Sequence, residues 1–159
     1  MVVSVLGPNQ ISLKAGTFTD AYRILFAAMR KHNVKRIFGL GTFSIVDPKD
    51  KPSWSTTLTV ALVWGVANAA YNEIVAVGKV FDDEAGGLDW TLYRVGGLGI
   101  GSDTKVTATY VGWPEYASSV NRLGIAKWLV EQLESSEPQY LHEKPCLCTS
   151  SVRMWDIRV

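Results

Sequence analysis

Apolar and polar residues follow each other in blocks that switch repeatedly between the spacing of a strand and that of a helix. Short apolar runs, several of them rich in β-branched residues, predict strands, and longer stretches with helical spacing predict helices. The expected strands cover residues 2–6, 34–40, 89–95, 104–111 and 145–150, and the expected helices about 20–32, 56–85 and 119–134. This order predicts an α/β fold with a mostly parallel sheet and helices on both faces.

Polar residues at the predicted helix ends identify candidate caps. Thr17 or Thr19 can cap the first helix, and Asn33 can end it. Ser118 or Ser119 can cap the last helix. Each is a residue type that satisfies the unpaired backbone groups of a helix end, either by its side chain or by its own backbone conformation.

The long helical stretch has its most apolar part between residues 58 and 70. This part is too short to span a bilayer and contains Trp64, Gly65 and Asn68, so it predicts a buried helix that breaks near Gly65. The start of the chain lacks the basic segment that opens a signal peptide. We therefore expect a cytoplasmic protein that does not enter a membrane.

Composition changes this picture little. A chain of 159 residues with 47% hydrophobic and 19% charged residues is typical of one globular domain. A net charge of +1, without a basic stripe, gives no reason to expect nucleic acid or an anionic membrane as a partner. Cys146 and Cys148 lack neighbouring His or carboxylate ligands, so we expect two reduced thiols on a terminal strand and no metal.

Glycine-rich turns follow the first three predicted strands. They are the segments Gly7-Pro8-Asn9, Gly41-Thr42-Phe43-Ser44 and Gly96-Gly97-Leu98. Ligands of open α/β sheets bind at the carboxyl ends of the strands, so these turns are the expected binding site. Neither "GLGTFS" nor "GGLGIGSD" leads directly into a helix, so neither is expected to form the phosphate-binding turn of a dinucleotide fingerprint.

Three segments give a more specific indication. They are "VVSVLGPN", "VKRIFGLGTFSI" and "EIVAVGKVFDDEAGGLDWTLYRVGGL". In order and spacing they resemble landmarks of the NAD(P)-binding, NmrA-like family, which are atypical short-chain dehydrogenases/reductases with a Rossmann fold. The third is the most specific, with Lys79, Glu84, the "LDWT" strand and Arg94 in the family's order. The resemblance covers about residues 1–100, and the last predicted helix fits the family's C-terminal part. The strand sequences are most similar to those of fungal members.

The resemblance implies where the chain lies within such a domain. It corresponds to the C-terminal two-thirds of a single Rossmann domain, with residues 100–159 on the substrate side. The strand at residues 2–6 matches about the fourth strand of the family, so the glycine fingerprint would lie upstream and the chain would be truncated. Such a strand would leave an apolar edge unpaired, and we expect possible self-association through it.

The resemblance also implies site residues. Those matching catalytic positions are Thr42, Ser44 and Lys79. Those matching cofactor-binding positions are Gly7, Pro8, Asn9, Gly41, Lys79, Arg94, Gly96 and Gly97. Arg94 can alternatively support the local structure by binding a carboxylate, with Glu84 as a candidate partner.

One catalytic position departs from the family. The family's Tyr should lie four residues before Lys79, and this position holds Val75. Tyr71 lies a further turn away, about 80° round a helix from Lys79 at 100° per residue. The Tyr–Lys pair of an active reductase is therefore broken in the sequence.

Three functions remain open at this stage. The first is an NAD(P)-dependent oxidoreductase that acts on a small carbonyl substrate with NADP or NAD. The second is a non-enzymatic protein that senses the dinucleotide, and the third is an inactive fragment. The residue that usually selects between NAD and NADP follows the second strand of the family, which this sequence does not show.

Overall fold

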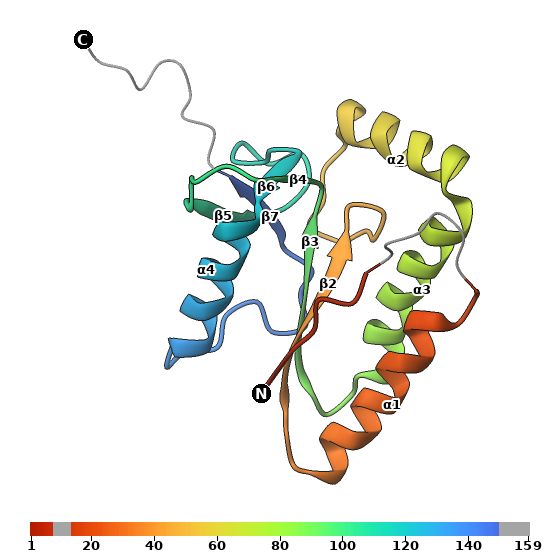
Figure 1. The fold of residues 1–159 in the computed structure, drawn as a ribbon, viewed down its shortest axis with the longest axis vertical. Helices are drawn as coiled ribbons and strands as arrows, with labels where there is room; N and C mark the ends of the chain where they lie inside the picture. The colour runs from red at the N-terminus through yellow and green to blue at the C-terminus, as the bar shows by residue number, and fades with distance from the viewer. Residues whose placement is uncertain (8–13, 150–159) are drawn as a thin grey trace.

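Strands and helices alternate through the computed structural model, which describes residues 1–7 and 14–149 (Figure 1). The elements are β1 (Val2–Val3), α1 (Thr17–Lys31), β2 (Arg36–Thr42), α2 (Trp54–Val66), α3 (Asn68–Glu84), β3 (Asp89–Val95), β4 (Gly97–Gly99), β5 (Val106–Thr109), β6 (Ser119–Asn121), α4 (Arg122–Glu134) and β7 (Cys146–Thr149). The predicted α/β class is confirmed.

The main sheet has the strand order β1-β2-β3-β7-β5. β1, β2, β3 and β7 are parallel, and only β5 runs antiparallel, against β7. β2 and β3 pair over their whole length, from Arg36 beside Asp89 to Thr42 beside Val95. A separate parallel pair, β4 and β6, continues beyond the end of β3. The sheet is therefore mostly parallel, as predicted.

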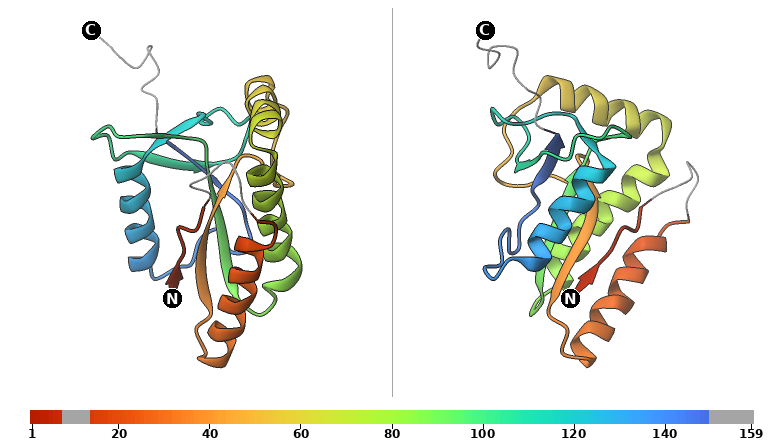
Figure 2. Two further views of the ribbon diagram at one scale, coloured as in Figure 1. Left: turned by 45° about the vertical axis from the view of Figure 1, so that its right-hand side comes forward. Right: turned by 60° about the vertical axis from the view of Figure 1, so that its left-hand side comes forward.

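Helices cover both faces of this sheet (Figure 2). α1 and α3 pack on one face, where Phe26 and Phe81 meet edge to face with ring centroids 5.1 Å apart. α4 lies on the other face, where Trp128 packs against Phe38 of β2. Gly39 of β2 lets α3 approach closely, because a Cβ there would lie 2.6 Å from the Phe81 ring.

The observed strand boundaries agree only in part with those predicted from the local sequence pattern. The strand predicted at residues 89–95 is confirmed at both ends, whereas β2 lies two residues later than predicted. β1 is confined to Val2–Val3 because only these residues pair with β2. β5 and β7 are shorter than expected, and β7 carries Cys146 and Cys148 as buried free thiols, as predicted.

The helix caps differ from most of the predictions. Gly16 precedes α1, so neither Thr17 nor Thr19 caps it. Asn33 adopts a left-handed φ of 54° just after α1, and this predicted end is confirmed. Its N–H bonds to Arg30 O and that of Val34 to Met29 O, which satisfies the last carbonyl groups of the helix.

The start of α4 is also corrected. Residues 119–121 form β6, so a Ser118 or Ser119 cap was wrong, and Asn121 occupies the cap position. The strand takes priority there because it pairs with β4.

The long helical stretch breaks at Ala67, two residues beyond the predicted Gly65, into α2 and α3. The chain bends by 119° between the two helices, which turns α2 across the end of the sheet (Figure 1). The prediction of a buried helix was wrong for α2, whose only buried residue is Thr56. Within the described residues no single helix has the length and apolar character to cross a membrane, and the bent pair of α2 and α3 passes that test only when taken together.

Candidate functional site

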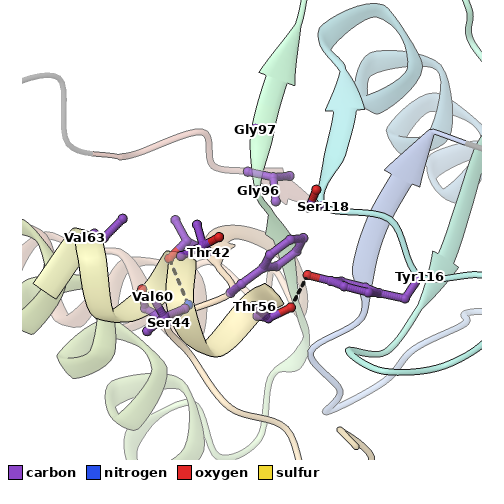
Figure 3. A pocket seen from close by; sticks show the side chains of 12 residues that line it. Thr42, Ser44, Thr56, Val60, Val63, Gly96, Gly97, Tyr116 and Ser118 are labelled. Atoms are coloured by element: carbon purple, nitrogen blue, oxygen red, sulfur yellow. Dashed lines mark hydrogen bonds between the residues drawn. The ribbon is translucent and has the colours of Figure 1, made fainter. Parts of the chain in front are cut away.

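A cavity of about 300 Å³ opens where β2 and β3 end beneath α2 (Figure 3). Its walls come from four separate parts of the chain. The lining residues are Thr42, Phe43, Ser44, Thr56, Thr59, Val60, Val63, Val95, Gly96, Gly97, Tyr116 and Ser118. The structure thus brings together Thr42, Ser44, Gly96 and Gly97, four of the residues expected at the site.

Hydroxyl groups supply the polar side chains of this cavity. The backbone N–H of Ser44 donates to Thr42 Oγ1 at 3.3 Å, as the dashed line in Figure 3 marks. This bond uses a lone pair of Thr42 and leaves its hydroxyl proton for a ligand. Across the cavity, the Thr56 and Tyr116 hydroxyls lie 2.7 Å apart and link α2 to the loop before β6.

The cavity has little capacity to hold charge. Its only ionisable lining side chain is Tyr116, and burial raises the pKa of this phenol, so it stays neutral at ordinary pH. No described lining residue carries a positive charge that would neutralise a phosphate. The arrangement therefore suits a neutral group that accepts hydrogen bonds from hydroxyls.

Protein packing requires a glycine at position 96 but not at position 97. A Cβ added at Gly96 would overlap the carbonyl oxygen of Ser118 and approach the Phe43 ring to 2.5 Å. Gly97 has more room, with Ser118 O 3.6 Å from the added Cβ. Gly41 is buried, and a Cβ there would lie 2.9 Å from Ile45 Cδ1, so it faces the core and does not line the cavity.

A second hollow of about 520 Å³ adjoins the first. The two share Phe43, Ser44, Thr56 and Val60 as lining residues. Tyr71, at the start of α3, also lines the second hollow, together with Trp64. The structure therefore places Tyr71 along the same cavity system as Ser44, although its position relative to Lys79 gave no reason to expect this.

Lys79 lies apart from these residues. It is exposed on α3 and lines a depression between α1 and α3 together with Arg23, Asp83 and Glu84. Neither cavity beneath α2 includes it. Glu84 accepts two hydrogen bonds from Arg23 Nε, at 2.9 and 3.0 Å, so it is not the carboxylate partner of Arg94.

Arg94 is fully buried and is held by three acceptor groups. Its guanidinium donates to both carboxylate oxygens of Asp50 at 2.6 and 2.7 Å. It also donates to the backbone oxygens of Ile45 at 2.7 Å and Lys144 at 2.5 Å. The structure therefore does not bring Arg94 into the cavity. The predicted carboxylate contact of Arg94 is confirmed, but the partner is Asp50 and not Glu84.

The loop after β1 is only partly described. Gly7 lies next to the Leu40 side chain, 3.3 Å from where its Cβ would be, and does not line either cavity. Pro8 and Asn9 lie outside the described residues.

Sequence reasoning missed the α2 wall and the loop before β6. These residues are Thr56, Thr59, Val60, Val63, Tyr116 and Ser118. The one available signal was an uncharged stretch between residues 52 and 72, longer than a core helix of this domain needs. Within the described part of the chain, no group of three His, Cys, Asp or Glu side chains could hold a metal ion.

Comparison with known proteins assigns the fold to a family. A family model described as NAD(P)H-binding matches residues 1–136. The chain belongs to this NAD(P)H-binding family. A search of curated proteins finds no significant match.

Solved structures share the fold of this chain at low sequence identity. The short-chain dehydrogenase/reductase (wide type) from Veillonella parvula, in complex with NADP, is 13% identical over 84% of the chain, with a TM-score of 0.61. The anaerobilin reductase ChuY from Escherichia coli is 17% identical over 95% of it, with a TM-score of 0.60. The oxidoreductase ylbE from Lactococcus lactis is 15% identical over 97% of it, with a TM-score of 0.61. The chain covers 60%, 64% and 64% of their respective lengths.

Proposed function

We propose that the chain binds a nicotinamide dinucleotide at the carboxyl end of its sheet and takes part in the NAD(P)-dependent reduction of a small carbonyl compound, as an NmrA-like reductase. The observation that carries the proposal is the cavity in which the Thr42 and Ser44 hydroxyls meet the Gly96-Gly97 turn. Membership of the NAD(P)H-binding family supports the cofactor, and the family resemblance supports the reaction.

The donor set fits one end of the cofactor. The uncharged nicotinamide amide can donate hydrogen bonds to the hydroxyls of Ser44 and Ser118 and accept hydrogen bonds from them. The diphosphate needs backbone N–H groups or cations, and no described lining side chain of the cavity is cationic, so we propose that the diphosphate lies towards Gly7. When bound, the reduced dinucleotide supplies the hydride.

The chain's own side chains would position the substrate carbonyl. The Thr42 hydroxyl, with a lone pair occupied by the Ser44 N–H, donates to the carbonyl oxygen and favours the negative charge that develops there. Tyr71 is the proposed proton donor, because it lines the second hollow, which shares Ser44 with the first cavity. The apolar α2 wall excludes water from one side.

A second function deserves a test because Val75 replaces the expected Tyr and Lys79 faces solvent. The protein would then bind the dinucleotide as a sensor without turning over a substrate. The inactive fragment is the third outcome, in which a folded chain binds no dinucleotide.

Titration of the monodisperse chain with NADPH, followed by turnover of a carbonyl panel, separates these outcomes. We expect saturable binding and turnover, with Thr42→Val and Tyr71→Phe lowering kcat at least tenfold. Thr17→Val, on the exposed start of α1, is the matched control and should change neither NADPH binding nor kcat. Binding without turnover refutes the reductase, and a folded chain that binds neither NADPH nor NADH refutes both dinucleotide functions.

We also propose that β1 allows two copies to associate. Within the described residues β1 pairs only with β2, and Val3 and Val5 are 40% and 70% exposed beside the unpaired edge. Light scattering after size exclusion should find dimers or larger species whose share falls in Val5→Lys. A wild-type chain that is monomeric at every concentration would contradict this association.

A further inference from the structure

The α2 helix has a surface that its own packing does not explain. Large apolar side chains are exposed all along it, among them Trp54 at 92%, Leu58 at 74% and Trp64 at 56%. No charged residue occurs between residues 52 and 72. A helix without charged residues and with large apolar side chains around it is normally covered by other groups, yet only Thr56 of α2 is buried.

The ends of α2 are fixed while its middle spans the cavities. At its start, Ser53 caps the helix and the Thr56 hydroxyl pairs with Tyr116. At its end, the chain turns by 119° into α3. Between these points, Val60 and Val63 face the first cavity, and Val60 and Trp64 face the second. A molecule in the cavities would therefore cover Val60, Val63 and Trp64, whereas Trp54 and Leu58 line neither cavity and would stay exposed.

The two ends of the cavity system differ chemically. The hydroxyls of Thr42 and Ser44 lie at the strand ends, while Val60 and Val63 form the α2 wall (Figure 3). Phe43 and Tyr116 add two aromatic rings, whose centroids are 5.4 Å apart. A ligand would thus place a hydrogen-bond acceptor at the strand ends and an apolar body under α2.

We propose that the substrate is an uncharged carbonyl compound with an apolar body, and that Val60 and Val63 of α2 select for that body. This inference rests on the proposed reductase function, since it places the reacting carbonyl at Thr42. A carboxylate next to the carbonyl is disfavoured in the first cavity, because no described lining residue there carries a positive charge and Lys51 lines only the second hollow.

A series of unbranched 2-ketones tests this selection. With NADPH as reductant, we expect kcat/KM to rise about fourfold for each added methylene, the factor that corresponds to about 0.8 kcal/mol per buried methylene, until the cavities are filled. Pyruvate, whose carboxylate lies beside the carbonyl, should be turned over at least a hundredfold less efficiently than the longer ketones. A flat series, or a preference for pyruvate, would overturn the proposal.

A matched pair of variants locates the effect. Val63→Ser should reduce the gain per methylene by half or more, whereas Val66→Ser, three residues further along α2 and 66% exposed, should leave it unchanged. Neither side chain is buried, so both variants should fold, which far-ultraviolet circular dichroism checks. Equal effects of the two variants would contradict a selective role for Val63.

Binding of the same ketones, measured by saturation-transfer NMR without NADPH, distinguishes a failure of the reductase proposal from a failure of the apolar-site proposal. Binding that strengthens with chain length and weakens in Val63→Ser, without turnover, would support the apolar site and refute the reductase. Turnover that does not depend on chain length would support the reductase and refute the apolar site. Absence of both binding and turnover would overturn both.

Discussion

Glu73 joins α3 to the start of α1, and its removal should destabilise the fold strongly. Its carboxylate accepts the backbone N–H groups of Gly16 at 2.9 Å, Phe18 at 2.7 Å and Thr19 at 3.1 Å. The side chain is almost fully buried. Since no side chain of α1 itself caps its first turn, this carboxylate from α3 does so.

The expected cost follows from these three bonds. Hydrogen bonds to a charged group contribute about 1.5–3 kcal/mol each when buried. Water can replace the bond at the partly buried Gly16, so we expect Glu73→Ala to lower the free energy of unfolding by about 3 kcal/mol. Glu73→Gln keeps one acceptor oxygen but loses the charge, and we expect a loss of about 1–2 kcal/mol.

The pH dependence of the stability gives a sharper test than the loss of stability in the Glu73 variants alone. Burial raises the pKa of Glu73, but the backbone hydrogen bonds from Thr19, Gly16 and Phe18 together lower it below its usual range. Because the folded-state pKa is below the unfolded value of about 4.3, the carboxylate stabilises the fold above that pH. This stabilisation is lost as the pH falls through the folded-state pKa.

Urea unfolding at pH 7 and at pH 3 measures both effects. The difference between wild type and Glu73→Gln should shrink at pH 3, because the variant has no carboxylate to protonate. Glu134→Gln, at the exposed end of α4, is the control and should not move the midpoint at pH 7. A Glu73→Gln variant as stable as wild type at pH 7, or a difference independent of pH, would refute this reasoning.

Three further outcomes are expected. Arg94→Lys should lower the free energy of unfolding by about 3 kcal/mol in urea titrations, because lysine cannot form the paired hydrogen bonds to the two oxygens of the partly buried Asp50 carboxylate; an unchanged midpoint would refute this. Gly96→Ala should lower the melting temperature, because the added Cβ would overlap Ser118 O, whereas Gly97→Ala, whose added Cβ makes only ordinary contacts at 3.6 Å, should leave it unchanged; equal effects on the melting temperature would contradict the packing argument. Burial raises the pKa of Cys146 to about 12, so this thiol should resist alkylation at pH 8 in the folded protein and react once urea unfolds it; fast reaction of the native protein would contradict its burial.

The sequence by itself determined the alternation of elements, the parallel sheet and the glycine turns at the strand ends. The strand at residues 89–95 was located correctly because its residues are buried on both faces, and such a run is visible in the local pattern. Asn33 was also visible, because the left-handed conformation that ends α1 is a property of that one residue.

Tertiary structure decided the features that depend on distant partners. The cap of α1 comes from Glu73, 55 residues beyond Phe18, and the partner of Arg94 is Asp50 and not the nearer Glu84. No local pattern encodes such pairs, because each residue alone is equally compatible with solvent exposure.

The candidate site divides in the same way. Thr42 and the Gly96-Gly97 turn were predicted, because the carboxyl ends of neighbouring parallel strands meet at one edge of a sheet. The α2 wall was not predicted, since its apolar sequence indicated burial and only the 119° turn after α2 carries it out of the core and over that edge. Hydrophobic pattern shows that a segment avoids water, while the folded arrangement decides whether protein or a ligand covers it.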